Sequence, residues 1–306
     1  MSLRRSSRAN AALPILPGNV GLLKKGAPRY DLRDPYHLAV SASWPVFSLT
    51  LLAVWAAINL LFALLYSLSA GGISNAAPGS FSDAFFFSIE TLATVGYGVM
   101  APTTTFTHIV SATEIVTGMA FTAIATGLMF VRFSRPNAKI FYAEQAVVTT
   151  FNDHHTLMIR LANGRMSVMT NANARLFALI GEHTTEGKYF RRIFDLRLMQ
   201  SQIPLFVMPW TLMHVIDEAS PLHGYGPEKM VAADIRLFLS VDARDQAIDT
   251  TVYDMKLYMP PDIRFGMRYA ESVTLDEEGH TTADLSRLSV LEPDDAAQPE
   301  WAQWLR

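Results

Sequence analysis

The chain has 306 residues, enough for two domains, and its 25 basic and 28 acidic side chains give a formal net charge of −3. It contains no cysteine, which excludes a disulfide framework and a thiolate metal site. The charges are distributed unevenly, because residues 44–131 contain no Lys or Arg and only the acids Asp83, Glu90 and Glu114. A soluble domain would scatter its charges, so this pattern indicates a region that crosses a membrane.

Residues 1–43 form the expected cytoplasmic N-terminal arm. Its first part, to about residue 28, is rich in Arg, Ala, Pro and Gly without periodicity, which favours an extended or disordered segment. Asp34 and Pro35 then indicate a helix start, with Asp at the N-cap and Pro at the first helical position. This short helix, which reaches Ser43, has mixed polarity, and we expect it to lie on the membrane surface.

Residues 44–137 predict a membrane domain. Residues 44–68 carry no charge and, at roughly 1.5 Å per residue, exceed the ~30 Å hydrocarbon core. Residues 108–131 form a second segment of spanning length. Between the two, residues 81–92 are apolar but too short to span, which suits a re-entrant segment.

The basic residues near the two spans predict the orientation. They lie before the first span and after the second, and the connecting loop has none, so both chain ends are expected in the cytoplasm. We expect six of them to form a basic collar at the cytoplasmic side of the membrane. The basic collar consists of Lys24, Lys25, Arg33, Arg132, Arg135 and Lys139.

Residues 138–306 predict a cytoplasmic domain of a different kind. From about Gln145 the sequence consists of short β-rich runs, separated by turn signals such as Asn152-Asp153 and Asn163-Gly164. Several such runs at this spacing favour an all-β sandwich. The predicted fold class is therefore a membrane α domain followed by an all-β domain.

Directly after the short apolar segment, Thr94-Val95-Gly96-Tyr97-Gly98 reads TVGYG. This pentapeptide is a known signature of potassium selectivity filters. The triplet GYG also occurs at residues 224–226, between prolines and without an apolar segment, where it indicates a surface turn. The alternative for the first copy is a chance glycine turn. The order of segments argues against it, because the pentapeptide follows a half-length apolar segment that lies between two spans.

In such a filter, backbone carbonyls replace the hydration shell of K⁺. Carbonyls point at one axis only if the backbone alternates in hand, which Gly96 and Gly98 permit at low cost. The ring of Tyr97 is expected to turn outward, toward the aromatic run of residues 85–87. A ring needs several such segments, and the potassium filter has four, so we expect a closed homotetramer. K⁺ is the expected permeant ion, no cofactor is expected, and the expected K⁺ ligands are Thr94, Val95, Gly96 and Tyr97.

With these motifs the chain resembles the inward-rectifier potassium channel family, and within it the prokaryotic KirBac branch. The resemblance runs from about Tyr30 to about Pro293. AFFFSIETLATVGYG matches the pore helix and filter, and RFSRPNAKI matches the juncture below the second span. TLMIRLANGR and FDLRLMQSQIPLFVMPWTLMHVIDEASPL match the cytoplasmic domain, which is an immunoglobulin-like β-sandwich in this family. The resemblance implies a location in a prokaryotic inner membrane.

Two positions depart from the family pattern. Val99 stands where many prokaryotic members carry Asp, and Met100 stands where eukaryotic members carry an Arg that pairs with the pore-helix acid. Glu90 therefore lacks that partner, and we expect it to hydrogen-bond behind the filter, with a solvated acid as the alternative. Glu114, an ionisable group inside a span, is expected to support the filter, with a snorkelling surface acid as the alternative.

Thr122, Thr126 and Phe130 recur at intervals of four, so they share one helix face. The resemblance implies that this face lines the cavity and that Phe130 forms a gate closing by dewetting, with packing of an aromatic near a span end as the alternative. Thr122 falls where strong rectifiers carry a polyamine-binding acid, so we expect weak rectification, with polyamine or Ba²⁺ block. Gly118 and Gly127 are expected to act as hinges or to permit close helix contact.

The resemblance also implies that the basic collar binds a phosphoinositide, a lipid that tends to inhibit prokaryotic members. Each basic residue near an anionic leaflet contributes about 1 kcal/mol. The alternative is a topology signal that needs no lipid site. Residues 246–252 correspond to the cytoplasmic constriction of the family, where Asp245 and Asp249 would face the ion path; acids placed there for solubility are the alternative.

We therefore predict a passive, homotetrameric potassium channel in which the surface helix couples the β domain to gating. No set of nucleophile, base and orienting group indicates an enzyme. His154 and His155 adjoin in a turn and are expected to face different ways, which argues against a metal site. A non-conducting membrane receptor whose β domain binds a partner is the alternative, and an intact filter argues against it.

Overall fold

The structure is a computed structural model that describes residues 13–15, 22–24, 34–275 and 280–294. Within it the chain divides into two compact units, one formed by Pro28–Arg135 and the other continuing from Pro136. Most of the expected N-terminal arm falls outside the described residues. Its described parts are a pair of antiparallel strands, β1 (Leu13–Ile15) and β2 (Leu22–Lys24), and residues 34–43, which contain a short helix.

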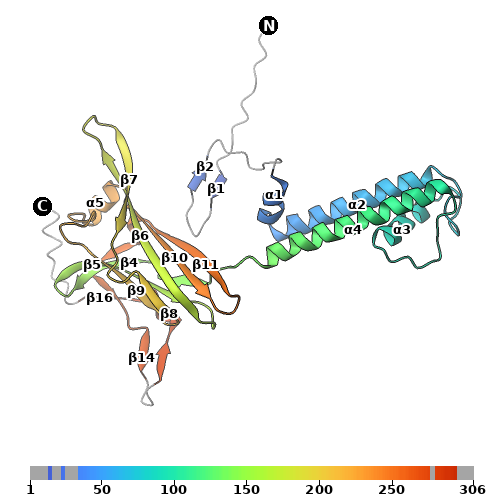
Figure 1. Cartoon of the computed structure of the whole chain (residues 1–306). Coiled ribbons are helices and arrows are strands. Elements are labelled where there is room, and N and C mark those ends of the chain that lie inside the picture. The colour runs from blue at the N-terminus through green and yellow to red at the C-terminus, as the bar shows by residue number, and fades with distance from the viewer. Residues whose placement is uncertain (1–12, 16–21, 25–33, 276–279, 295–306) are drawn as a thin grey trace, which may run out of the picture. The chain divides into compact units, whose positions relative to one another are not determined.

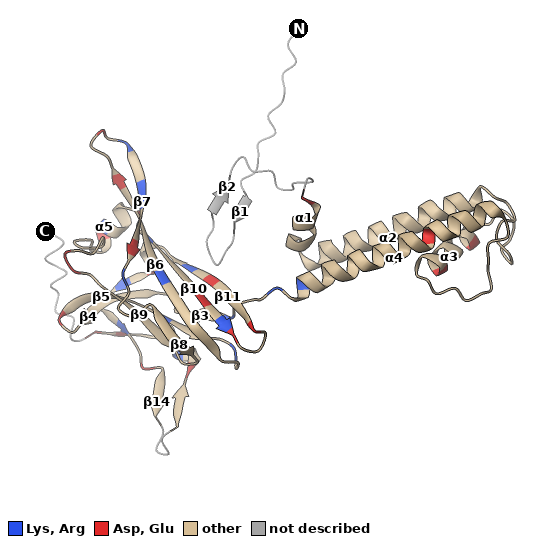
Figure 2. Cartoon of the chain, viewed as in Figure 1, with Lys and Arg blue, Asp and Glu red and all other residues tan. Residues whose placement is uncertain are grey.

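Four helices make up the first unit: α1 (Pro35–Ser41), α2 (Trp44–Ser67), α3 (Phe81–Leu92) and α4 (Thr105–Phe133). Helices α2 and α4 run side by side, and the shorter α3 lies against them at one end (Figure 1). Among the described residues, α2 and α4 are the two helices long and apolar enough to cross a membrane. Both are almost free of charged side chains (Figure 2).

Local capping determines where these helices begin. The Asp34 carboxylate accepts a hydrogen bond of 2.9 Å from the His37 amide, and Pro35 occupies the first turn of α1, as their sequence order predicts. Helix α4 begins earlier than the expected start at residue 108. Thr104 and Thr107 form a reciprocal capping box there, which satisfies two amide groups that the helix leaves unpaired.

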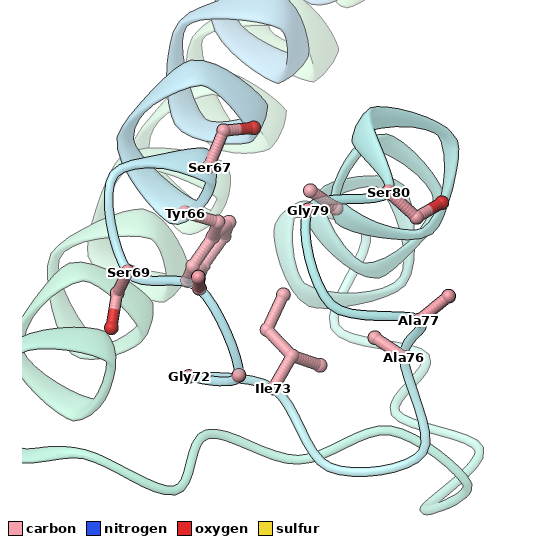
Figure 3. A pocket seen from close by; sticks show the side chains of 12 residues that line it. Tyr66, Ser67, Ser69, Gly72, Ile73, Ala76, Ala77, Gly79 and Ser80 are labelled. Carbon is pink, nitrogen blue, oxygen red and sulfur yellow. The ribbon is translucent and has the colours of Figure 1, made fainter.

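A small apolar core joins the helices of this unit. Figure 3 shows Tyr66 of α2 and Ile73 of the following loop, which line a cavity beside the start of α3. The buried apolar residues of this core are Phe62, Ala63, Tyr66, Ile73, Ala84, Phe87 and Val110. Other faces of α2 and α4 expose large apolar side chains, which is expected of surfaces that meet lipid or other subunits.

The second unit is a β-sandwich of two five-stranded sheets. One sheet has the order β11-β10-β6-β7, with β8 also paired to β6, and the other has the order β12-β4-β5-β3, with β9 also paired to β5. Buried Ala, Leu, Ile and Val side chains from both sheets form one continuous core between them. The first sheet contains β6 (Met169–His183), β7 (Tyr189–Leu196), β8 (Gln202–Phe206), β10 (Arg236–Asp245) and β11 (Thr250–Tyr258). The second contains β3 (Ile140–Tyr142), β4 (Ala146–Phe151), β5 (His154–Asn163), β9 (Trp210–Val215) and β12 (Ile263–Phe265).

Short elements complete this unit, and the fold class predicted from the sequence is confirmed. Strands β13 and β16 pair with each other, as do β14 and β15. These elements are α5 (Pro227–Ala232), β13 (Met267–Tyr269), β14 (Val273–Leu275), β15 (Thr281–Ala283), β16 (Leu291–Pro293) and the 3₁₀ turns Pro260–Asp262 and Leu285–Arg287. The second GYG triplet lies in the turn before α5, where Gly224 has φ +75° and Gly226 precedes the first helical residue.

Candidate ion-conduction site

The TVGYG segment follows the C-terminal end of α3 as an extended backbone of alternating hand. Thr94, Gly96 and Gly98 have φ values of +56°, +54° and +82°, whereas Val95 and Tyr97 between them do not have positive φ. Glycine adopts such angles at little cost, but a β-branched residue such as Thr94 does so only at a strained position. An alternating backbone is the conformation that a row of carbonyls needs to face one axis.

Helix α3 anchors this segment through its last carbonyl groups. The Glu90 carbonyl accepts hydrogen bonds from the amides of Val95 (2.9 Å) and Gly96 (3.3 Å), and the Thr91 carbonyl accepts one from Thr94 (3.0 Å). These bonds use carbonyls that a helix C-terminus leaves without internal partners. The start of the filter segment is therefore fixed to the end of the half-length helix.

The loop between α2 and α3 holds the other end of the segment. The Asn75 side-chain amide donates a hydrogen bond of 2.6 Å to the carbonyl of Val99. The Ser74 hydroxyl accepts one of 2.9 Å from the amide of Ala101, and the Ser74 amide donates one of 2.8 Å back to the Ala101 carbonyl. Sequence reasoning missed Ser74 and Asn75, because a polar loop gives no signal of which residues reach the filter.

Aromatic packing differs from the expectation around Tyr97. Its ring is 74% exposed in the single chain. Phe87 packs instead on Tyr66, with ring centroids 5.0 Å apart, and Phe85 lies against Phe86 at 6.1 Å. Helical geometry directs Phe87 toward the core of the unit, so the aromatic run does not enclose Tyr97 within one chain.

The two acids behind the filter have different environments. The Glu90 side chain is half-buried and makes no hydrogen bond or ion pair within the part of the chain that the structure describes, so the expected carboxylate bond is not formed there. Its backbone carbonyl, and not its carboxylate, accepts hydrogen bonds from the filter segment. Glu114 is fully buried and accepts hydrogen bonds from the hydroxyls of Tyr66 (2.7 Å) and Ser88. This burial excludes the surface-acid alternative for Glu114.

The expected cavity face is open in the single chain. Thr122, Thr126 and Phe130 are all exposed along α4, and Phe130 is 71% exposed. The two glycines of α4 differ in their surroundings. A Cβ atom on Gly118 would lie 2.1 Å from the Leu92 carbonyl oxygen, whereas one on Gly127 would meet nothing within 4 Å. Of the two alternatives stated for Gly118, the structure therefore favours close helix contact over a hinge.

The structure corrects one member of the basic collar. Arg132 is 8% exposed, and its guanidinium donates to the carbonyls of Ala39, Val40 and Ala42 at the end of α1. It is not exposed to lipid, because three carbonyl groups without helical partners bind it. Of the other members, Arg135 and Lys139 are exposed, Lys24 belongs to β2, and Lys25 and Arg33 lie outside the described residues.

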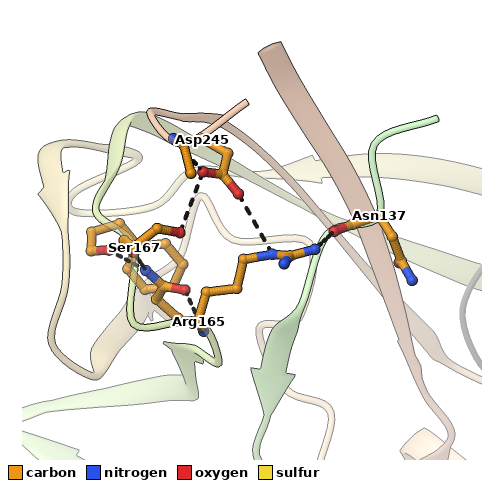
Figure 4. A network of polar contacts seen from close by, with 7 residues as sticks. Asn137, Arg165, Ser167 and Asp245 are labelled. Carbon is orange, nitrogen blue, oxygen red and sulfur yellow. Dashed lines mark hydrogen bonds and ion pairs between the residues drawn. The ribbon is translucent and has the colours of Figure 1, made fainter. Parts of the chain in front are cut away.

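The structure also corrects the placement of Asp245, which is buried inside the β-sandwich. It is 1% exposed, pairs with Arg165 at 3.5 Å, and accepts hydrogen bonds from Ser167 (3.3 Å) and the Ala247 amide (2.9 Å). Arg165 also donates a hydrogen bond of 2.6 Å to the Asn137 carbonyl (Figure 4). Burial of an acid requires such partners, which the sequence does not reveal. Asp249 is exposed and pairs with Arg244 at 2.6 Å.

His214 is a buried histidine of the β-sandwich with a partner at each ring nitrogen. The His214 ring lies between the Arg197 carbonyl and the Ser220 hydroxyl, each at 2.8 Å. Burial lowers the pKa of His214 below its usual 6.5. Among the described residues, no group of three or more His, Cys, Asp or Glu is placed to hold a metal ion.

Two spanning helices, a half-length helix that presents an alternating TVGYG backbone, and an all-β domain define a two-span channel. The sequence profile of the inward rectifier potassium channel C-terminal domain matches residues 140–299, and an ion channel profile matches residues 49–135. The chain therefore belongs to the inward rectifier potassium channel family.

Individual relatives agree with this assignment. The chain is 35% identical to the inward rectifier potassium channel Kirbac3.1 of Paramagnetospirillum magnetotacticum, over 88% of this chain and 90% of that protein. It is 30% identical to ATP-sensitive inward rectifier potassium channel 14 of Homo sapiens, over 82% of this chain and 62% of that longer protein. Among solved structures, the sporulation control protein Spo0M of Bacillus subtilis, 9% identical, matches 45% of this chain and 59% of its own with a TM-score of 0.21, a likeness too low to carry an argument.

Proposed function

We propose that four copies of this chain form a potassium-selective pore through which K⁺ permeates passively. The observation that carries the proposal is the positive φ at Thr94, Gly96 and Gly98 in a TVGYG segment fixed to the end of a half-length helix. Family membership supports the same assignment. The proposed K⁺ ligands are the carbonyls of Thr94 to Tyr97 and the Thr94 hydroxyl.

The exposure of the filter in one chain supports the proposed tetramer. Val95, Tyr97 and Val99 are all more than half exposed, and a filter carbonyl row on one side of an ion cannot replace its hydration shell. Phe130 is exposed in the same way, and a ring of four such side chains would close the pore by dewetting. Thr122 is neutral, so the cavity is proposed to bind polyamines weakly, and Ba²⁺ is the proposed blocker of the filter.

Regulation by an anionic lipid such as a phosphoinositide is the second part of the proposal. Its support is the exposure of Arg135 and Lys139. Arg132 is buried and does not contribute to this site. The proposed location is a prokaryotic inner membrane, which the similarity to the channel of Paramagnetospirillum magnetotacticum supports. Both chain ends are proposed to lie in the cytoplasm, because the basic residues lie outside the two spans.

Ion flux into liposomes tests the proposal. Purified full-length protein is reconstituted into vesicles loaded with KCl, and uptake of labelled Rb⁺ is followed. We expect uptake that Ba²⁺ blocks and that external Na⁺ cannot replace. Addition of phosphatidylinositol bisphosphate to the vesicles should lower the uptake. Absence of uptake in every lipid composition, with the protein confirmed as folded, would contradict conduction.

A further inference from the structure

A buried polar cluster, formed by Asn59, Tyr66, Ser88 and Glu114, joins the three helices of the membrane domain. We call it the pore-helix brace. All four side chains are between 0 and 1% exposed, and they come from α2, α3 and α4. Polar groups in such a place are costly unless each finds a partner, so their arrangement is specific.

Ser88 is the centre of the pore-helix brace. Its hydroxyl contacts Glu114 Oε1 on α4 and lies 3.2 Å from both the backbone carbonyl and the side-chain oxygen of Asn59 on α2. Tyr66 Oη donates a hydrogen bond of 2.7 Å to Glu114 Oε2, so both carboxylate oxygens are bound. The Asn59 amide donates to the Trp55 carbonyl at 2.8 Å. Ser88 therefore ties α3 to both α2 and α4, and Tyr66 ties α2 to α4.

One turn further along, α4 touches the end of α3 directly. Gly118 lies four residues after Glu114, and Leu92 lies four residues after Ser88, so both pairs follow the same faces of the two helices. The absent side chain of Gly118 lets the α4 backbone approach the Leu92 carbonyl so closely that a Cβ would stand 2.1 Å from it. Leu92 is the last residue of α3, and the filter begins two residues later at Thr94.

We propose that the pore-helix brace and the contact of Gly118 with Leu92 position the selectivity filter, so that a shift of α4 at this level changes the filter itself. Glu114 and Ser88 fix the rotation of α3 about its axis. Gly118 fixes the depth of its C-terminal end, whose carbonyls accept hydrogen bonds from the amides of Thr94, Val95 and Gly96. The inference rests on the proposed potassium conduction, and it assigns Tyr66, Ser88 and Gly118 as positioning residues for ion selectivity.

A pair of matched glycine substitutions separates this role from a hinge. Gly118→Ala and Gly127→Ala both place a stronger helix former inside α4. Only Gly118→Ala meets a backbone oxygen, because Gly127 has open space within the protomer. In liposomes we expect Gly118→Ala to lower the ratio of Rb⁺ to Na⁺ uptake and the Ba²⁺ sensitivity by about tenfold, as a lost interaction of ordinary strength would. Gly127→Ala should keep the selectivity ratio.

Substitutions in the pore-helix brace provide the second test. Ser88→Ala and Tyr66→Phe each leave one Glu114 oxygen without its donor, and we expect each to lower the same uptake ratio. Glu114→Gln keeps the shape and a side-chain oxygen that still accepts from a hydroxyl, so it should retain more selectivity than Glu114→Leu. Assembly of every variant is checked by size-exclusion chromatography in detergent, and only variants that elute as the wild type are compared.

The outcomes distinguish the proposed positioning role from the proposed potassium conduction. If the wild-type protein conducts selectively and the assembled Ser88→Ala, Tyr66→Phe and Gly118→Ala variants keep its ion ratio and Ba²⁺ sensitivity, the positioning role is overturned while conduction stands. Equal loss in Gly118→Ala and Gly127→Ala would identify α4 stiffness as the cause and would also overturn it. If the wild-type protein shows no flux, the proposed function fails first.

Discussion

Arg132 Nη2 donates a hydrogen bond of 2.9 Å to the carbonyl oxygen of Ala42, which links the end of α4 to the residue that ends α1. The same guanidinium lies 4.6 Å from the centroid of the Trp44 ring and 4.4 Å from that of Phe47. A cation near a helix C-terminus interacts favourably with the helix dipole. Its position over aromatic rings adds a second favourable interaction. Arg132 thus connects α1, α2 and α4 within the membrane unit.

Substitution of Arg132 should destabilise this connection. Arg132→Lys keeps the charge but cannot reach three carbonyls with a planar fork, so we expect a loss of about 1–3 kcal/mol in unfolding free energy. Thermal unfolding of the detergent-solubilised protein and proteolysis near residues 42–44 measure it. The matched control is Arg135→Gln, whose side chain is exposed and whose loss should leave stability within about 0.5 kcal/mol. Equal stability of Arg132→Lys and the wild type would contradict the role.

The sequence predicted the membrane helices well, because their signal is local. Absence of charge and segment length placed α2 and α3 within a residue of their observed ends. The long strand β6 was missed, because Asn171, Asn173 and several alanines are poor strand formers, although polar and apolar residues alternate over residues 171–176. Its pairing with β7, β8 and β10 determines its structure, and that information is not local.

The site residues also divide into those with a local sequence signal and those whose structure depends on distant partners. The TVGYG segment was recognisable because its chemistry lies in consecutive residues. Arg132 and Asp245 were assigned to lipid and to the ion path, yet both are buried with partners distant in sequence. Tyr66 and Ser88 were not singled out, although a Tyr and a Ser within apolar helices are a signal that could have been followed.

Removal of the charge at Asp245 should lower the free energy of unfolding more than the same change at Asp249. Asp245→Asn places an amide beside Arg165 and weakens two further hydrogen bonds in a buried position, so we expect a loss of about 1–3 kcal/mol. Asp249 is exposed in its ion pair and has φ +49°, an angle that Asn also tolerates, so Asp249→Asn should cost less than about 1 kcal/mol. Thermal unfolding of the full-length variants compares them, and equal losses would contradict the burial argument.

Acidic pH should weaken the β-sandwich through His214. Burial lowers its pKa in the folded state, so below its usual pKa of 6.5 the unfolded chain takes up a proton that the folded chain does not. This contribution to stability is therefore full above pH 6.5 and is lost as pH falls toward the folded pKa, with a slope of up to about 1.4 kcal/mol per pH unit. His214→Gln should flatten the dependence of unfolding temperature on pH between 6.5 and 5, and an unchanged slope would exclude His214 as its source.

A carboxylate at Thr122 should convert weak block by polyamines into strong block. Thr122 is exposed on α4, and four copies of Thr122→Asp around the proposed pore would place a ring of negative charge in a cavity whose walls have a low dielectric constant. We expect the affinity for spermine applied from the cytoplasmic side to rise at least about tenfold, or about 1.4 kcal/mol, and to depend on voltage. Single-channel recording in planar bilayers measures the block, with Thr122→Asn as the neutral control of similar size. Spermine block that is equally strong in the wild type, Thr122→Asn and Thr122→Asp would place the polyamine site elsewhere in the pore.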